Sequence, residues 1–199
     1  MSVVQRIAFT ASNKFADPNV FGTALEIVKS KPGFLSSFHG LQIDDGKTGY
    51  FITVWQSTEH YFSFAQGSAY SDFLTALKPA AADELEIHHV HTGSVDVTTA
   101  LTAPTTELVL WTLKAGVTIE EITPLFIELG RSLDIAKGAY PPSVWAPSKD
   151  SDKHILVFVG WDSVEAHMEA VKEGTEAHAV IGLFAPKADY LLGHAHFVK

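Results

Sequence analysis

The sequence predicts an α+β protein made of two tandem ferredoxin-like βαββαβ units. A chain of 199 residues with 46% hydrophobic and 19% charged residues can bury the core of one large domain or two small ones. Patterns typical of strands and helices follow each other in the order βαββαβ, twice. The chain also repeats itself, with Trp-x-Ser at 55–57 and 161–163, and His-x-His at 89–91 and 194–196. A period of about 100 residues indicates duplicated domains rather than a solenoid.

The first unit, residues 1–97, is expected to contain two helices and four strands. Asp17-Pro18 offers a helix cap followed by proline at the first helical position, and Pro32-Gly33 ends this helix. Ser57 caps the second helix, which Gly67 interrupts. The expected strands occupy residues 6–11, 34–43, 50–55 and 85–91. The third of these strands is apolar on both faces, which favours a central place in the sheet.

The second unit, residues 107–199, follows a Thr/Ala/Pro-rich stretch, residues 98–106, that we interpret as a linker. Thr118-Ile119-Glu120-Glu121 has the form of a capping box, and Pro124 predicts either a kink or a later helix start. Ser163 caps the next helical pattern. The expected strands occupy residues 108–113, 138–147, 154–161 and 191–197. The second of these holds three prolines, which is typical of an irregular edge strand.

Composition excludes several classes of protein. A net charge of -9 without a basic cluster argues against nucleic-acid binding. Without cysteine, the chain can form neither disulfides nor thiolate zinc sites. The first residues lack the pattern of a signal peptide, and no apolar run reaches the roughly 18 residues of a membrane span. We therefore expect a cytoplasmic protein. Its one compositional oddity is a count of ten histidines.

Several motifs of the first unit carry a resemblance to a known family. The run Lys31–Phe38, the tripeptide Trp55–Ser57 and the helix end near Phe73-Leu74 resemble the dimeric α+β barrel superfamily. Its small members include antibiotic-biosynthesis-type monooxygenases and stress-responsive barrel proteins. The resemblance implies that the two units pack sheet to sheet as an α+β barrel, with a pocket for a small hydrophobic or aromatic molecule in each half. Exposed sheet edges would allow such barrels to form a homodimer.

His178 is the candidate catalytic residue. Polyketide cyclases that resemble this group carry an acid/base histidine in the second helix region, and Glu176-Ala177-His178 is similar to that segment. A neutral histidine beside an apolar pocket could act as a general base. The first unit has Ser71 at the corresponding place, and Lys172 stands where the cyclases carry a partner tyrosine. The alternative is an exposed histidine at a helix end.

Strand alternation places the two histidines of each His-x-His segment on one face. In the second segment Ala195 and Phe197 suit the helix-covered side, so we expect its histidines to face the barrel interior or solvent. Two imidazoles on one strand face lie about 7 Å apart and could bind a metal with a third ligand. No Asp or Glu at a suitable spacing accompanies them, so we predict no metal site. A polar pocket wall and a purely structural role both stay open.

Further side chains could line the two pockets. The candidates for ligand binding are His39, Trp111, Trp145, His89, His91, His194 and His196. Aromatic residues at such places more often belong to the core. His60 and His167, each in the first turns of a helix among polar neighbours, are interpreted as solvated.

We expect a cofactor-free enzyme of cyclase, isomerase or monooxygenase type that acts on a hydrophobic carbonyl or polyphenolic compound by histidine acid/base chemistry. A non-catalytic carrier or stress-related barrel is the alternative. Haem binding through a histidine, known among relatives of the superfamily, is a third reading. Arginine occurs only at Arg6 and Arg131, so no arginine-rich haem pocket is evident, and no cofactor is expected.

Overall fold

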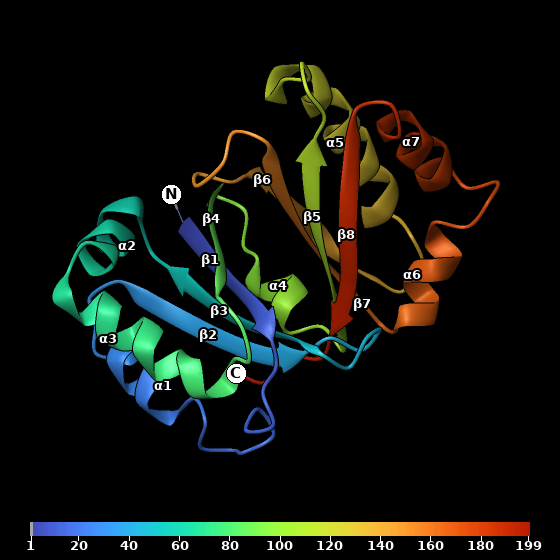
Figure 1. Cartoon of the computed structure of the whole chain (residues 1–199). Helices are drawn as coiled ribbons and strands as arrows, with labels where there is room; N and C mark the ends of the chain where they lie inside the picture. The colour runs from blue at the N-terminus through green and yellow to red at the C-terminus, as the bar shows by residue number, and fades with distance from the viewer. Residues whose placement is uncertain (1) are drawn as a thin grey trace. The chain divides into compact units, whose positions relative to one another are not determined.

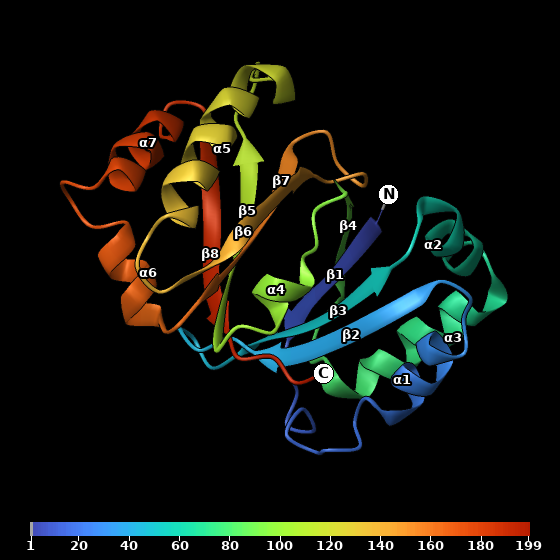
Figure 2. The ribbon, with the colours of Figure 1, turned by 180° about the vertical axis from the view of Figure 1, so that it is seen from behind.

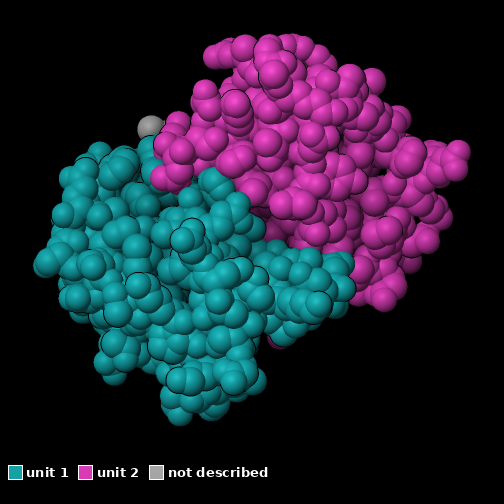
Figure 3. Space-filling view, viewed as in Figure 1, with its two compact units in different colours: residues 1–94, 198–199 teal, residues 95–197 magenta. Residues whose placement is uncertain are grey.

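The computed structural model describes residues 2–199 and contains two four-stranded antiparallel sheets. The chain divides into a first unit, which runs to Ser94 and includes Val198–Lys199, and a second unit, Val95–Phe197 (Figure 3). Each unit is a ferredoxin-like βαββαβ arrangement whose second helix is broken in two, so the predicted fold class is confirmed. None of the helices within residues 2–199 has both the length and the apolar character that crossing a bilayer demands.

The first unit has the sheet order β2-β3-β1-β4, with β3 in the interior as predicted. Its elements are β1 (Ser2–Thr10), α1 (Gly22–Lys29), β2 (Phe34–Leu41), β3 (Thr48–Trp55), α2 (Thr58–Ala65), α3 (Ser68–Leu77), the 3-10 helix η1 (Lys78–Ala80) and β4 (Glu86–Gly93). Ser57 caps α2 by accepting a hydrogen bond from the backbone of His60. Helix α1 starts later than Pro18, because the Asp17 carboxylate accepts from the Asn19 backbone and forms a local turn instead.

The second unit repeats this plan in the order β6-β7-β5-β8. Its elements are α4 (Thr98–Leu101), β5 (Thr105–Leu113), α5 (Ile119–Asp134), β6 (Ala139–Pro147), β7 (His154–Trp161), α6 (Val164–Ala170), α7 (Glu176–Phe184) and β8 (Ala188–Ala195). Thr118 caps α5 through the Glu121 backbone, and the helix runs on through Pro124. Strand β6 is the predicted irregular edge, with a register shift between Tyr140 and Val144.

The segment interpreted as a linker, residues 98–106, is part of the second unit. It contains α4 and the first residues of β5. Ala100 and Ala103 are buried over Gly160 of β7, where an added Cβ would lie 2.8 Å from the Ala103 side chain. The Thr106 hydroxyl holds the segment in place by donating a hydrogen bond to the Ala100 carbonyl at 2.7 Å. Small side chains, which suggested a linker, here allow a helix to approach a sheet closely.

In each unit the helices that follow the first and third strands cover one face of the sheet (Figures 1 and 2), whereas α4 lies against the other face of the second sheet, over Gly160. Val109 and Trp111 of β5 pack beneath α5 and α7, and the pairing of Glu107 with His194 places both side chains on that covered face. The expectation that His194 faces away from the helices was therefore wrong. It relied on Ala195 and Phe197, but Ala195 alternates onto the face opposite to His194, and β8 ends at Ala195, so alternation does not extend to Phe197.

The turn before β2 offers a test of local packing. Gly33 has a φ of 75°, and an added Cβ would lie 2.1 Å from Cγ of His60 in α2. We expect Gly33→Ala to lower the free energy of unfolding by about 2–4 kcal/mol, through backbone strain and overlap with a ring that anchors the helix. Gly22→Ala is the control, because no atom lies within 4 Å of its added Cβ. Urea denaturation of both variants measures the difference, and equal stability would contradict the packing described.

Candidate functional site

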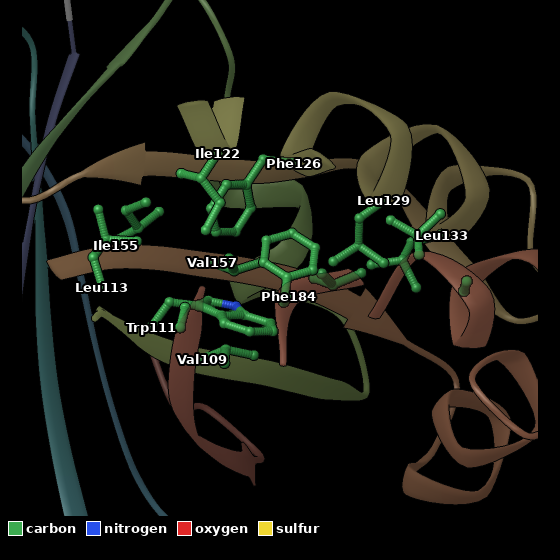
Figure 4. Close-up of a cluster of buried hydrophobic side chains, with 14 of the residues drawn as sticks. Val109, Trp111, Leu113, Ile122, Phe126, Leu129, Leu133, Ile155, Val157 and Phe184 are labelled. Carbon is green, nitrogen blue, oxygen red and sulfur yellow. The ribbon is translucent and has the colours of Figure 1, made fainter. Parts of the chain in front are cut away.

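A cavity of about 230 Å³ lies inside the second unit, between the sheet and its helices. Figure 4 shows much of the apolar cluster around it. Two lining side chains are at least half exposed, Met168 at 55% and Tyr190 at 50%, and they lie at the opening of the cavity. The lining residues are Glu107, Val109, Trp111, Leu129, Leu133, Val157, His167, Met168, Val171, Ile181, Tyr190 and Leu192. Its wall is thus almost entirely apolar, with a carboxyl and an imidazole as the buried titratable groups.

Glu107 is the most unusual of these lining residues, because a carboxyl is buried on the core face of a central strand. It is only 4% exposed. The Trp161 indole Nε1 donates to its Oε2 at 2.8 Å. Burial raises the pKa of Glu107 to about 7, although the bond from Trp161 acts in the opposite direction. A carboxyl with such a pKa can both accept and release a proton near neutrality.

Two buried histidines lie next to this carboxyl, one after the other. His167 is 2% exposed, because α6, capped at Ser163, directs its first full turn toward the sheet. Its Nε2 lies 3.5 Å from Oε2 of Glu107, an ion-pair distance rather than a short hydrogen bond. Its Nδ1 lies 2.8 Å from Nε2 of the buried His194, so one of these two nitrogens carries the shared hydrogen. Glu107, His167 and His194 form a continuous row of three titratable groups, which we call the acid/base row.

The first unit has a neutral counterpart of the acid/base row. Gln5 pairs with His89 as Glu107 pairs with His194, and Tyr61 occupies the place of His167 on the corresponding helix. The Gln5 amide donates to the Tyr61 hydroxyl at 3.3 Å and accepts from Thr53 at 3.3 Å. These partners satisfy Gln5 without any acidic group. Of the two units, the second therefore carries a carboxyl at this position.

Differences in side-chain volume explain why the second unit has room for a ligand beside its carboxyl. In the first unit Tyr70 reaches Gln5, with 2.7 Å between its hydroxyl and the Gln5 amide nitrogen. Ala177 takes the place of Tyr70 in the second unit, at an offset of 107 from the paired glycines. Val157, which lines the cavity, likewise replaces the larger Phe51. Because close-packed interiors do not close such gaps completely, the missing rings leave a cavity.

The structure places His178 away from this cavity. It lies on the exposed side of α7, with Nδ1 3.1 Å from the Val171 carbonyl oxygen. Ala177 and Val180 take the buried positions of that helix. The expectation that His178 borders the pocket is corrected, because helical periodicity turns it to solvent.

The predicted ligand-binding residues of the second unit separate into two groups. Trp111 lines the cavity and His194 belongs to the acid/base row. Trp145 stacks on Phe126 at 5.1 Å and does not line the cavity. His196 lies beyond the end of β8, exposed, with Nδ1 3.0 Å from the Pro104 carbonyl oxygen.

The three candidates of the first unit lie on the helix-covered face of its sheet. His39 is partly buried against Phe21, with 4.6 Å between the ring centroids, and burial lowers its pKa. His89 is buried against Tyr61 at 4.8 Å, and the ring of His91 follows at 6.0 Å from that of His89. These histidines belong to the packing of the first unit, as the structural reading allowed.

Sequence reasoning missed Glu107 and misread His167 as solvated. Two signals could have found them. Glu107 shares the strand face of Val109 and Trp111, so alternation puts a carboxyl on an apolar face. His167 lies 106 residues after Tyr61. Since Tyr61 recurs with other apolar residues on one side of its helix, the internal repeat places His167 on the same side of the second unit's helix.

Other features of the second unit are less suited to chemistry. A larger depression of about 640 Å³ is bordered by exposed charged side chains such as Glu165, Glu169 and Lys172. It has no buried titratable group in its wall. Within residues 2–199, no three His, Cys, Asp or Glu side chains are arranged to hold a metal ion.

Comparison with known proteins places the fold. No protein-family model and no curated protein sequence matches the chain. An anthrone oxidase-like protein is similar in structure over 100% of this chain and 91% of its own, with a TM-score of 0.70 and 14% identity. A candidate monooxygenase from Fusobacterium nucleatum is similar over 100% and 93%, with a TM-score of 0.67 and 12% identity. One from Lactobacillus acidophilus is similar over 99% and 94%, with a TM-score of 0.66 and 13% identity.

The chain shares the fold of these proteins, with two ferredoxin-like units in tandem. Haem binding through a histidine is one of the alternatives that the sequence leaves open, so the fit of that group to the cavity matters. A volume of about 230 Å³ is below the range of about 300–1,000 Å³ typical of sites for drug-sized ligands. Both ring nitrogens of His167 already face protein atoms, Glu107 and His194. The residues present do not fit haem.

The buried carboxyl makes stability depend on pH. The pKa of Glu107 is raised from 4.5 to about 7, so the folded state holds a proton that the unfolded state releases between these values. The stabilisation that this bound proton gives the folded state is fully present below about pH 4.5. It decreases by about 3 kcal/mol as the pH rises to about 7. The Glu107→Gln variant should therefore gain stability relative to wild type as pH rises from 4.5 to 8. Urea denaturation of both proteins at each pH measures the difference. A constant difference would contradict a neutral carboxyl at Glu107.

Proposed function

We propose that the cavity of the second unit is a cofactor-free active site for a small hydrophobic carbonyl or phenolic compound. The observation that supports this most is the acid/base row at its buried side, with Glu107 as its first member. Structural cores rarely keep a carboxyl without a cation beside it, since burial penalises its charge. A carboxyl held at a pKa of about 7 inside an apolar cavity is suited to moving protons.

Glu107 and His167 would act as the proton acceptor and donor. A ligand in the cavity meets both side chains, because both line it. Glu107 takes a proton from an acidic C–H or O–H of the ligand, and His167 stabilises the resulting charge or returns the proton. The apolar wall keeps water from the carbanion or phenolate formed. His194 contacts His167 and orients its ring, so it would be a positioning residue.

Oxygenation is the reaction type that we favour among cyclase, isomerase and monooxygenase. The similar folds include proteins named as a candidate monooxygenase and as anthrone oxidase-like. In such a reaction the base removes a proton from a CH₂ group activated by a conjugated carbonyl. The carbanion transfers electrons to dioxygen, and a CH₂ group plus O₂ gives a carbonyl plus water. A cavity slightly larger than one of about 150 Å³, which holds benzene, suits one ring or two fused rings, with further rings at the mouth.

Glu107→Gln tests the proposed base with anthrone as the substrate, by oxygen uptake and by absorbance of anthraquinone. The amide keeps an oxygen for Trp161 but cannot accept a proton, so we expect a loss of about 10²–10⁴ in kcat. If wild type does not exceed the rate in buffer, anthrone is not a substrate. Tight binding of anthrone without any turnover would instead favour the non-catalytic carrier.

His194→Gln and His89→Gln form a matched pair, because the two histidines hold equivalent places in the two units. We expect His194→Gln to lower kcat about tenfold with KM little changed, and to shift the pH profile of kcat, since it loosens the ring of His167. His89→Gln should keep kcat within about twofold. Equal losses in both variants would point to a structural effect instead.

A further inference from the structure

One residue that lines the cavity, Trp111, carries a hydrogen-bond donor that the acid/base row does not use. Trp111 lines the cavity and is 4% exposed, and its indole Nε1 has no hydrogen-bond partner among the described residues. A buried N–H without a partner has lost its hydrogen bond to water without gaining another, so proteins rarely retain one without a reason. In Figure 4 the nitrogen lies on the edge of the Trp111 ring that faces Val157 and Phe184. Neither of these side chains offers a polar acceptor.

The donor belongs to the unit that has the cavity. Strand pairing aligns Gln5 with Glu107, and four residues later it aligns Phe9 with Trp111. Phe9 packs in an aromatic cluster and has no N–H to satisfy. The change from phenylalanine to tryptophan thus coincides with the changes from Gln5 to Glu107 and from Tyr70 to Ala177. Of these three positions, Glu107 and Trp111 both line the cavity.

One strand supplies the polar groups at both ends of the cavity. Glu107, Val109 and Trp111 alternate onto the same face of β5. Glu107 and Trp111 are four residues apart, which corresponds to about 13 Å between their Cα atoms. Val109 lies between them as an apolar floor. A ligand that uses both ends must therefore be elongated, with its acidic hydrogen at one end and a hydrogen-bond acceptor at the other.

We infer that the cavity recognises an aromatic ketone whose carbonyl oxygen accepts from Trp111 Nε1 while its acidic group faces Glu107 and His167. This assignment deepens the proposed function and rests on it for the acidic end of the ligand. The carbonyl and the acidic hydrogen lie at opposite ends of one conjugated ring. Electron density released by proton removal then reaches the carbonyl oxygen, where the Trp111 N–H stabilises the developing charge.

Two probes of nearly equal size test the acceptor site. 4′-Hydroxyacetophenone carries a phenol at one end and a carbonyl at the other, whereas 4-ethylphenol lacks the carbonyl. We expect wild type to bind the ketone about tenfold more tightly, the value of one good hydrogen bond, in calorimetric titration. Trp111→Phe should reduce this ratio to within about twofold and leave the affinity for 4-ethylphenol nearly unchanged. Trp145→Phe is the control, because Trp145 does not line the cavity, and it should keep the tenfold ratio.

A second measurement does not depend on the folding of a variant. The chain has four tryptophans, and the indole N–H signal of Trp111 should move downfield in the ¹⁵N-correlated NMR spectrum with the ketone but not with 4-ethylphenol. An unchanged ratio in Trp111→Phe, an equal loss for both probes, or an unmoved Trp111 signal would overturn the assignment.

The outcome is separable from the proposed function. Glu107→Gln should keep the preference for the ketone, because its altered group lies at the other end of the ligand. Loss of anthrone turnover in Glu107→Gln together with an unchanged ratio in Trp111→Phe would remove the acceptor site and keep the proposed base. If the protein does not turn over anthrone but its preference for the ketone depends on Trp111, the acceptor site is kept and the proposed base is removed.

Discussion

A polar side chain buried at the start of the central strand, beneath the helices, must find partners inside the core. In each unit this constraint falls on one residue, Gln5 or Glu107, beside a tryptophan of the neighbouring strand. Trp161 donates directly to Glu107, whereas Trp55 donates to Thr53, which in turn donates to Gln5. Since an unpaired buried polar group costs more than a bond contributes, the surrounding residues have to match this one.

The two units satisfy the same constraint in different ways. The first unit surrounds a neutral amide with hydroxyl groups, and the ring of Tyr70 fills the space beside it. The second unit places a carboxyl there and meets it with an indole and the imidazole of His167. Burial raises the pKa of this carboxyl to about 7. The two units thus share a fold, while a few differences in side chains separate a packed core from a cavity with buried titratable groups.

Local physical chemistry determined much of what the sequence could predict. Hydroxyl caps at Ser57, Thr118 and Ser163 act within a few residues, and each is seen. The central strands could be recognised because apolar residues on both faces of a strand have to be covered on both of these faces. The proline-rich strand became an edge, since its missing N–H groups exclude it from the interior. The linker was misread because small residues serve a flexible connection and a close helix–sheet contact equally well.

The sequence by itself determined the duplication, the order of the elements and the buried aromatic core, because periodicity and capping are properties of neighbouring residues. The acid/base row was decided by tertiary structure alone. Glu107, His167 and His194 come from β5, α6 and β8, and only strand pairing and helix packing bring them together. The cavity likewise depends on which large side chains are missing from one core and present in the other. For this reason the sequence pointed to His178, one helix away from His167 of the acid/base row.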